Sequence, residues 1–202
     1  ARRLQLCVRQ RSQPFSDTSM QIRALTPQDA SSFRALRLRG LRECPEAFAS
    51  SYEEELETPL AEIERSLQPK PDAVVFGAFD AHGLVALLGL QRESMTKLAH
   101  KVFIWGVYVA PEARGRGIGT HVLRHALDYA ANVLQVRQVN LGVNTRNTAA
   151  ISLYKKLGFV PFGLERGFML VDGELHDECH MVRLLAGAAE PHAHDDPTRQ
   201  AP

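Results

Sequence analysis

The sequence predicts one domain of the α/β class, and three observations lead to this prediction. Strand-like apolar runs alternate with amphipathic helical patterns between residues 20 and 185. The chain has 202 residues, 45% of them hydrophobic, which is enough for one substantial core. A glycine-rich stretch follows directly on one of the strands and leads into a helix. The sequence contains no internal repeat, and nothing in it points to a second domain.

The domain opens with a strand and two helices. Residues 20–25, "MQIRAL", are strand-like. Thr26 is typical of an N-cap, and the proline after it suits the first helical position, so we expect a helix over about 27–43. Thr58 repeats this signal for a shorter helix over about 59–67.

Three strands follow. Residues 73–80 and 84–91 are apolar runs separated by a short turn that contains Gly83, which predicts a hairpin. Residues 101–109, "KVFIWGVYV", form the third run, and the glycine-rich stretch comes next. The middle of the chain therefore contributes the core of a sheet.

The last third alternates again. Apolar residues recur at helical spacing over 122–134, and 139–143 is another strand. Residues 148–158 predict a helix ended by its final glycine, and 167–185 predict a closing hairpin that turns at residues 172–173.

The two ends differ from this domain. Residues 1–19 are rich in arginine and lack an apolar period, so we expect Met20 to be the natural start and 1–19 to be a disordered or artificially added leader. A transit peptide is the alternative. Residues 186–202 contain no large apolar residue, and we expect a disordered tail.

Composition excludes several kinds of partner. The net charge is +1, so no global field draws the protein to nucleic acid. No apolar run reaches the roughly 18–20 residues of a membrane span. Cys7, Cys44 and Cys179 have no partner at metal-ligand or redox spacing, which favours the cytoplasm and argues against a metal site.

The glycine-rich stretch "RGRGIGT", residues 114–120, predicts an anion site. Backbone amides at the start of a helix have no intrahelical acceptor, and the helix dipole favours negative charge there. A nucleoside-triphosphate loop would need a lysine, and none lies between Lys101 and Lys155. A dinucleotide fingerprint would need glycine where Thr120 stands. A turn without a ligand remains the simpler alternative.

The same stretch resembles the GNAT superfamily of acyl-CoA N-acyltransferases. "RGRGIGT" matches its Arg/Gln-x-x-Gly-x-Gly/Ala signature, and "NTRNTAAISLYKKLGF" is similar to its following helix. The order of elements from about 20 to 185 also agrees. The resemblance implies a mixed, twisted sheet of about seven strands flanked by about four helices, and acetyl-CoA as the cosubstrate.

The resemblance also implies where coenzyme A binds. The backbone of Val107 and Val109 would pair with the pantetheine arm, and the amides of the glycine-rich stretch would hold the pyrophosphate. The residues of that stretch expected at the cofactor are Arg114, Gly115, Arg116, Gly117, Ile118, Gly119 and Thr120.

Asn147 and Tyr154 are seven residues apart and so share one face of the predicted helix. Asn147 would contact the pantetheine chain, and by resemblance Tyr154 would be the general acid for the departing thiolate. An ordinary tyrosine is a weaker acid than a thiol, so a hydrogen bond to the sulfur is the milder form of this role. Two structural alternatives stay open: Asn147 as the N-cap of its helix and Tyr154 as a core aromatic residue.

The acceptor side is less visible in the sequence. An alkylammonium group has to lose a proton before it attacks, yet the strand 101–109 has no carboxylate, where some members of the family place one. The candidates for a base elsewhere are Glu53, Glu54, Glu55, His176, Asp177 and Glu178. On alternating strand geometry His176, Glu178 and His180 share one face.

We therefore expect an enzyme that transfers an acetyl group from acetyl-CoA to a primary amine of a small molecule or peptide by direct attack. We place the cleft between the strand ending near Val109 and the strand near Leu141. A non-catalytic acyl-CoA-binding module on the same fold is the alternative, and a nucleotide-dependent enzyme is a third interpretation. The resemblance also favours a homodimer. The sequence does not identify the amine.

Overall fold

The computed structural model describes residues 20–185, so the expected leader and tail lie outside the described residues. Helices and strands alternate as the sequence predicts. The strands are β1 (Gln21–Ala24), β2 (Ala73–Asp80), β3 (Gly83–Arg92), β4 (Lys101–Val109), β5 (Gln138–Asn144), β6 (Val160–Val171) and β7 (Glu174–Leu184). The α-helices are α1 (Ala30–Glu43), α2 (Tyr52–Leu56), α3 (Leu60–Ser66), α4 (Ile118–Asn132) and α5 (Thr148–Lys156). Single 3-10 turns are η1 (Pro27–Asp29), η2 (Pro45–Ala47), η3 (Thr96–Leu98) and η4 (Pro111–Ala113).

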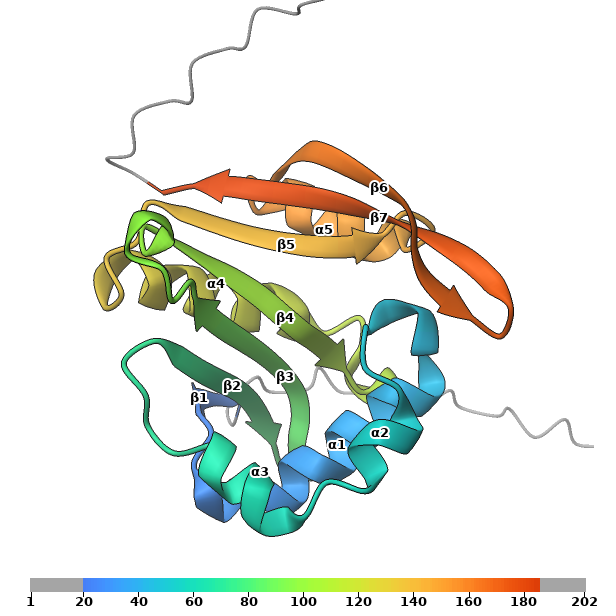
Figure 1. Ribbon diagram of the computed structural model, residues 1–202. Coiled ribbons are helices and arrows are strands. Elements are labelled where there is room, and N and C mark those ends of the chain that lie inside the picture. The colour runs from blue at the N-terminus through green and yellow to red at the C-terminus, as the bar shows by residue number, and fades with distance from the viewer. Residues whose placement is uncertain (1–19, 186–202) are drawn as a thin grey trace, which may run out of the picture.

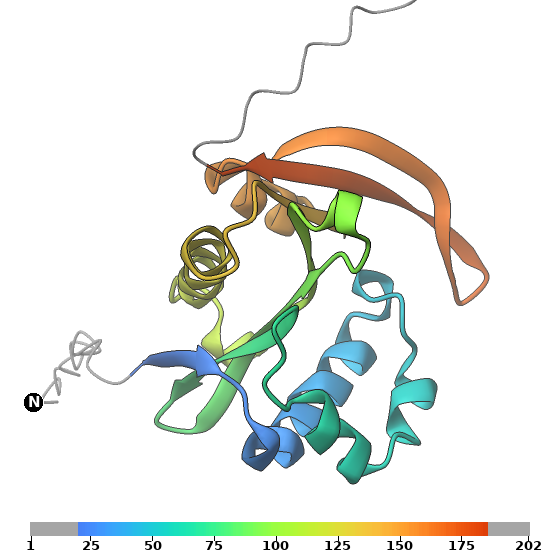
Figure 2. The same ribbon diagram turned by 60° about the vertical axis from the view of Figure 1, so that its left-hand side comes forward.

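The strands form one mixed sheet in the order β1-β2-β3-β4-β5-β7-β6. Only β4 and β5 pair in parallel, and α4 provides the crossover between them. Helices α1, α2 and α3 cover one face of the twisted sheet, and α4 and α5 cover the other (Figures 1 and 2). The expected α/β domain with about seven strands is confirmed.

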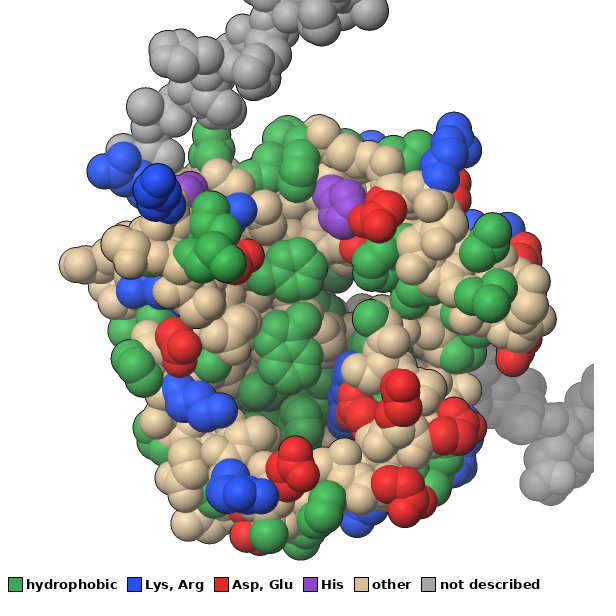
Figure 3. All heavy atoms as spheres, in the orientation of Figure 1, with side chains coloured by type: hydrophobic (Ala, Val, Ile, Leu, Met, Phe, Trp, Pro, Cys, Tyr) green, Lys and Arg blue, Asp and Glu red, His purple; other side chains and the backbone are tan. Residues whose placement is uncertain are grey.

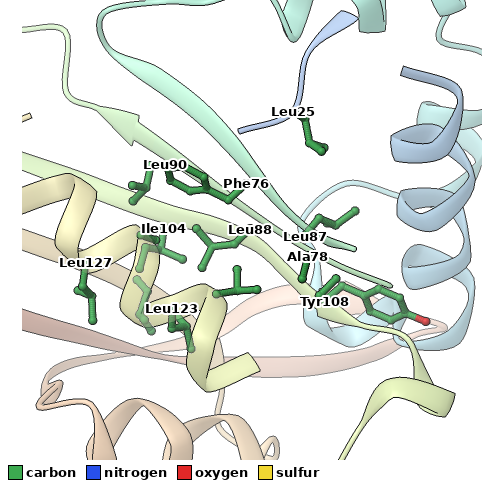
Figure 4. Packing of buried hydrophobic residues seen from close by; sticks show 14 of the residues in the cluster. Leu25, Phe76, Ala78, Leu87, Leu88, Leu90, Ile104, Tyr108, Leu123 and Leu127 are labelled. Carbon is green, nitrogen blue, oxygen red and sulfur yellow. The ribbon is translucent and has the colours of Figure 1, made fainter. Parts of the chain in front are cut away.

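Apolar side chains from the middle strands and α4 make the core (Figure 4). Leu88 of β3 and Leu123 of α4 are fully buried, because β3 lies in the middle of a sheet that helices cover on both faces (Figure 2). Phe76 of β2 packs edge-on against the rings of His125 and Tyr129, with centroids 4.8 and 5.2 Å apart. The core thus fixes α4, and with it the glycine-rich stretch, against the sheet.

Two elements differ from the prediction. Helix α2 was not expected, because its five residues are mostly acidic; Ser51 caps it by accepting a hydrogen bond from the Glu54 amide at 3.2 Å. Strand β6 begins at Val160 rather than at 167. It lies at the edge of the sheet, where Pro161 is tolerated because its missing N–H faces away from a neighbour.

Strands β4 and β5 pair only over a short distance. Their parallel register ends at Ile104 and Leu141, and beyond this point the two strands diverge (Figure 1). The pairing of β4 with β3 is also irregular here, since one extra residue of β4 lies between the Gly89 and Leu87 pairs. Gly106 occupies the bulge with φ of +65°. The bulge turns the end of β4 away from β5.

No helix within residues 20–185 is both long and apolar enough to cross a membrane.

Candidate active site

A cleft of about 680 Å³ opens where β4 and β5 diverge. Its walls are the unpaired end of β4, the end of β5 and the first turns of α4 and α5. Nearly all of the residues predicted for the site line this cleft: Val107, Val109, Arg114, Gly115, Gly117, Ile118, Gly119, Thr120, Asn147 and Tyr154. Arg116 does not, since its guanidinium pairs with Asp80 at 2.8 Å.

The glycine-rich stretch forms one end of the cleft. Gly115 and Gly117 have φ of +75° and +76°, a left-handed conformation that side chains disfavour. The first hydrogen bond of α4 runs from the His121 amide to the Gly117 carbonyl at 3.1 Å. The amides of the first three residues, 118–120, therefore have no intrahelical acceptor, and they can bind an anion.

The third glycine of the stretch has a different role. Gly119 has ordinary helical geometry, but a Cβ there would lie 3.4 Å from Leu153 and 3.6 Å from Val109. Its small size allows α5 and β4 to approach the start of α4. Arg114 closes the turn by donating from Nε to the Val109 carbonyl at 2.9 Å. Two of the three glycines therefore serve the backbone conformation of the turn, and the third serves packing.

Tyr154 is buried and faces the cleft from α5. Its ring packs edge-on against Phe159, with centroids 5.9 Å apart. Burial raises the pKa of its phenol to about 12, because the phenolate would lose its hydration. The side chain is therefore both a core aromatic residue and a neutral O–H donor at the cleft.

Asn147 begins α5 and caps it. Its Oδ1 accepts a hydrogen bond from the Ala150 amide at 3.0 Å. The structural alternative for this residue is therefore realised, while its side chain still lines the cleft. Because Oδ1 is engaged, the amide nitrogen is the part of Asn147 that can serve a ligand.

The far end of the cleft contains a residue that sequence reasoning missed. Asn144, at the end of β5, is buried and donates to the Glu46 carbonyl at 3.0 Å, while the Nδ1 of His176 lies 3.1 Å from the same nitrogen. Asn144 thereby joins β5 to η2 and β7. A polar residue at a strand end is too common to have signalled this role. The Asn144–Arg146 turn then leads directly into α5.

The acidic candidates for a base have different surroundings. Glu54 caps α2, Glu53 is exposed, and Glu55 pairs with the buried guanidinium of Arg37 at 2.6 Å. On β7 the expected face is confirmed, because His176 and Glu178 both lie on the side of the sheet that carries α1 to α3. Asp177 points elsewhere and accepts from the Gly167 amide.

No group of three or more His, Cys, Asp and Glu residues between 20 and 185 is arranged to hold a metal ion. The cleft itself is lined mainly by backbone groups, small residues and apolar side chains. Such a site can bind an extended thioester by its main chain and an anionic end at the helix start.

Comparisons with known proteins agree with this geometry. The sequence profile of the acetyltransferase (GNAT) family matches residues 40–159. The chain is 34% identical to the N-alpha-acetyltransferase RimI of Mycobacterium tuberculosis over 140 residues, which are 69% of this chain and 84% of that protein. It is 29% identical to the spermidine N(1)-acetyltransferase of Vibrio cholerae over 48% of this chain and 57% of that enzyme.

The fold is likewise shared with solved structures. The structure of yncA from Salmonella typhimurium, determined with its cofactor acetyl-CoA, superposes with a TM-score of 0.70. The superposition covers 87% of this chain and 99% of yncA at 21% sequence identity. The order of strands and helices is therefore common to both proteins.

The capping role of Asn147 gives a stability prediction. Asn147→Ala should lower the free energy of unfolding by about 1 kcal/mol, because the Ala150 amide loses its acceptor. Asn147→Asp keeps that acceptor and should change stability by less than about 0.5 kcal/mol. Urea denaturation of the three proteins measures both effects. An Asp variant as unstable as the Ala variant would contradict the capping role.

Proposed function

Because the chain belongs to the acetyltransferase (GNAT) family and is an acetyl-CoA-dependent N-acyltransferase, we propose that acetyl-CoA binds in the cleft between β4 and β5. The observation that carries this proposal is the coincidence of the diverging strands with the glycine-rich start of α4. One end of the cleft suits a pyrophosphate and the other suits a thioester. The relatives are named as enzymes, which gives no support to a non-catalytic module.

Each part of the cofactor has a proposed partner. The amides of residues 115–120 bind the pyrophosphate, with Arg114 beside them, while the unpaired edges of Val107 and Val109 receive the pantetheine amides. Arg114 already engages the Val109 carbonyl, so the remaining groups of this edge carry the pairing. Arg116 acts at a distance, by tying the loop to Asp80.

Tyr154 donates a hydrogen bond to the sulfur of the leaving coenzyme A. Full proton transfer from a phenol of pKa about 12 to a thiolate of pKa ~8.5 is uphill by about 5 kcal/mol. A neutral donor nevertheless stabilises the negative charge that develops on sulfur. This role fits the burial of Tyr154 better than that of a general acid.

The acceptor approaches from the face that carries α1 to α3. Figure 3 shows a hollow in the middle of this face, with hydrophobic side chains inside it and acidic side chains over α2 and α3 at its margin. A groove of about 720 Å³ also runs between residues 41–53 and the tip of the β6–β7 hairpin. Negative charge at the entrance attracts an ammonium group. We propose a primary amine of a small molecule or peptide as the acceptor.

The proposal extends to assembly and location. Strand β6 lies at the edge of the sheet and exposes Val160, Phe162 and Leu164, each more than half accessible. An apolar edge of this kind favours pairing with a second copy, and we propose a homodimer through β6.

Cys44 and Cys179 are free thiols, which is compatible with the reducing cytoplasm that we propose as the location of the protein.

The direct test of function is thiol release from acetyl-CoA in the presence of an amine. Polyamines, amino acids, aminoglycosides and peptides with free N-termini should be compared, and we expect release that depends on one of these classes. Gly117→Ala should weaken coenzyme A binding at least 10-fold, because the strained turn displaces the amides. Gly158→Ala carries the same left-handed strain outside the cleft and should bind normally. No release with any amine would contradict the proposed function.

Tyr154→Phe tests the hydrogen bond to sulfur. We expect kcat to fall about 10- to 100-fold, as for a lost hydrogen bond to a charged group, while the Kd of coenzyme A stays unchanged. The phenol stays neutral below a pKa of about 12, so the wild-type rate should show no loss at high pH from this group up to pH 10. Steady-state kinetics and calorimetry measure these quantities. An unchanged kcat would leave Tyr154 with a packing role alone.

The β6 edge gives a prediction on mass. Sedimentation equilibrium should give the mass of two chains, and Phe162→Glu should shift it to one, because a charge cannot be buried in the apolar contact. Met95→Glu places the same charge on an exposed apolar residue outside β6, and it should leave the dimer intact. A wild-type protein of single-chain mass would exclude this interface.

A further inference from the structure

We propose that Glu178 is the catalytic base that removes a proton from the acceptor ammonium group. The inference rests on the proposed function and completes it on the acceptor side. An alkylammonium group of pKa ~10.4 is neutral in only about one molecule in 10³ at pH 7. A carboxylate that receives its proton at the site therefore increases the reactive fraction.

The location of Glu178 is set by the glycine opposite it. Its carboxylate lies directly on the backbone of Gly142, so that a Cβ at that position would overlap the Glu178 side chain. Gly142 lines the cleft and follows Leu141, the last residue of β5 that pairs with β4. The carboxylate thus stands where the strands begin to diverge. An isolated glycine in a strand pattern is the sequence signal for such a close approach.

Glu178 also lies on the correct face. Gly142 and Asn144 are two residues apart on β5, and Asn144 bonds to η2 just after α1. The carboxylate is therefore on the face covered by α1 to α3, from which the acceptor approaches. Tyr154 belongs to α5 on the opposite face (Figure 2). Proton acceptor and sulfur hydrogen-bond donor consequently stand on the two sides of the diverging strands.

Of the other carboxylates near this face, Glu46 lines the cleft from η2, and three more are already engaged. Glu55 is held by Arg37, Glu43 by Arg39 and Tyr108, and Glu54 by the cap of α2. Within residues 20–185, Glu178 forms no ion pair with lysine or arginine. Its side chain is 12% exposed, and Nδ1 of His180 lies 3.6 Å from its Oε1. A carboxylate without a fixed cation keeps its capacity to accept a proton.

The surroundings tune this carboxylate. Burial raises the pKa of Glu178, and Glu165 on β6 adds to the rise, while His180 on β7 opposes it. Nε2 of His180 in turn contacts the Glu165 carboxylate at 3.1 Å. Strand β5 contributes only the neutral Gly142 and Asn144. His176 shares the same face of β7, and Glu46 lines the cleft from η2.

The acceptor nitrogen loses two protons in the proposed reaction, and Glu178 accepts the first. The acceptor ammonium gives one proton to the Glu178 carboxylate, and the freed lone pair forms the C–N bond at the thioester carbonyl. The C–S bond then breaks, and its electron pair leaves on sulfur, which accepts a hydrogen bond from Tyr154. The second proton of the nitrogen is lost as the amide forms and neutralises the thiolate. The proton on Glu178 returns to solvent before the next turnover.

The test compares Glu178→Gln with the wild type on two amines. With an alkylamine that is protonated at pH 7, kcat/KM should fall at least about 100-fold, and the KM for acetyl-CoA should not change. With 2,2,2-trifluoroethylamine, which is neutral at pH 7, the two proteins should differ less than about 5-fold. Glu178→Asp should recover part of the alkylamine activity. Glu64→Gln, on the exposed side of α3, should behave as wild type.

The pH profile separates a base from a structural residue. In the wild type, kcat/KM should fall below the pKa of Glu178. Because Glu165 raises that pKa, Glu165→Gln should move the acidic limb to lower pH with its slope kept. Equal losses of Glu178→Gln with both amines, or full activity with the alkylamine, would overturn the role of Glu178 alone. A wild type that releases no thiol with either amine would overturn the proposed function as well.

Discussion

The structure depends on one interruption of hydrogen bonding in the sheet. Strands β4 and β5 pair up to Ile104 and Leu141 and then part, although unpaired backbone groups are costly inside a protein. Here the unpaired backbone groups line a cleft, where a ligand can form hydrogen bonds with them. The bulge at Gly106 turns the end of β4 away from β5, and Gly119 lets α5 and β4 pack closely against the start of α4. Binding and catalysis are therefore built around a place where regular secondary structure stops.

Glycine sets this arrangement at several levels. Gly117 adopts a left-handed backbone conformation, whereas Gly119 leaves space for α5 and β4 to pack against α4. Gly142 supplies room for a carboxylate. These three glycines serve different purposes, but all of them line the same cleft. A substitution at any of them acts on a different property: the amides of the loop, the packing of α5, or the position of Glu178.

The sequence predicts the elements well where periodicity is long. The pattern "KVFIWGVYV" places β4 at its observed bounds, and the glycine-rich stretch predicts which amides open α4. The prediction missed α2, because its residues are mostly acidic and show no apolar period. The capping box of Ser51 nevertheless starts a helix there. The contacts of Asn144 and Glu178 depend on β5, β7 and η2 meeting in space. The residues in those contacts are 32 to 98 positions apart in the chain, so a local pattern such as the lone Gly142 does not identify its partner.

Trp105 is the chain's one tryptophan, and its place gives the cleft a built-in optical probe. The indole lies across Gly89, where a Cβ would overlap it, and borders both the cleft and a smaller pocket of about 220 Å³ beside α1 and α3. The intrinsic indole emission therefore arises at the end of the cleft where the strands part. A change in its intensity or wavelength reports events at that point, without any label.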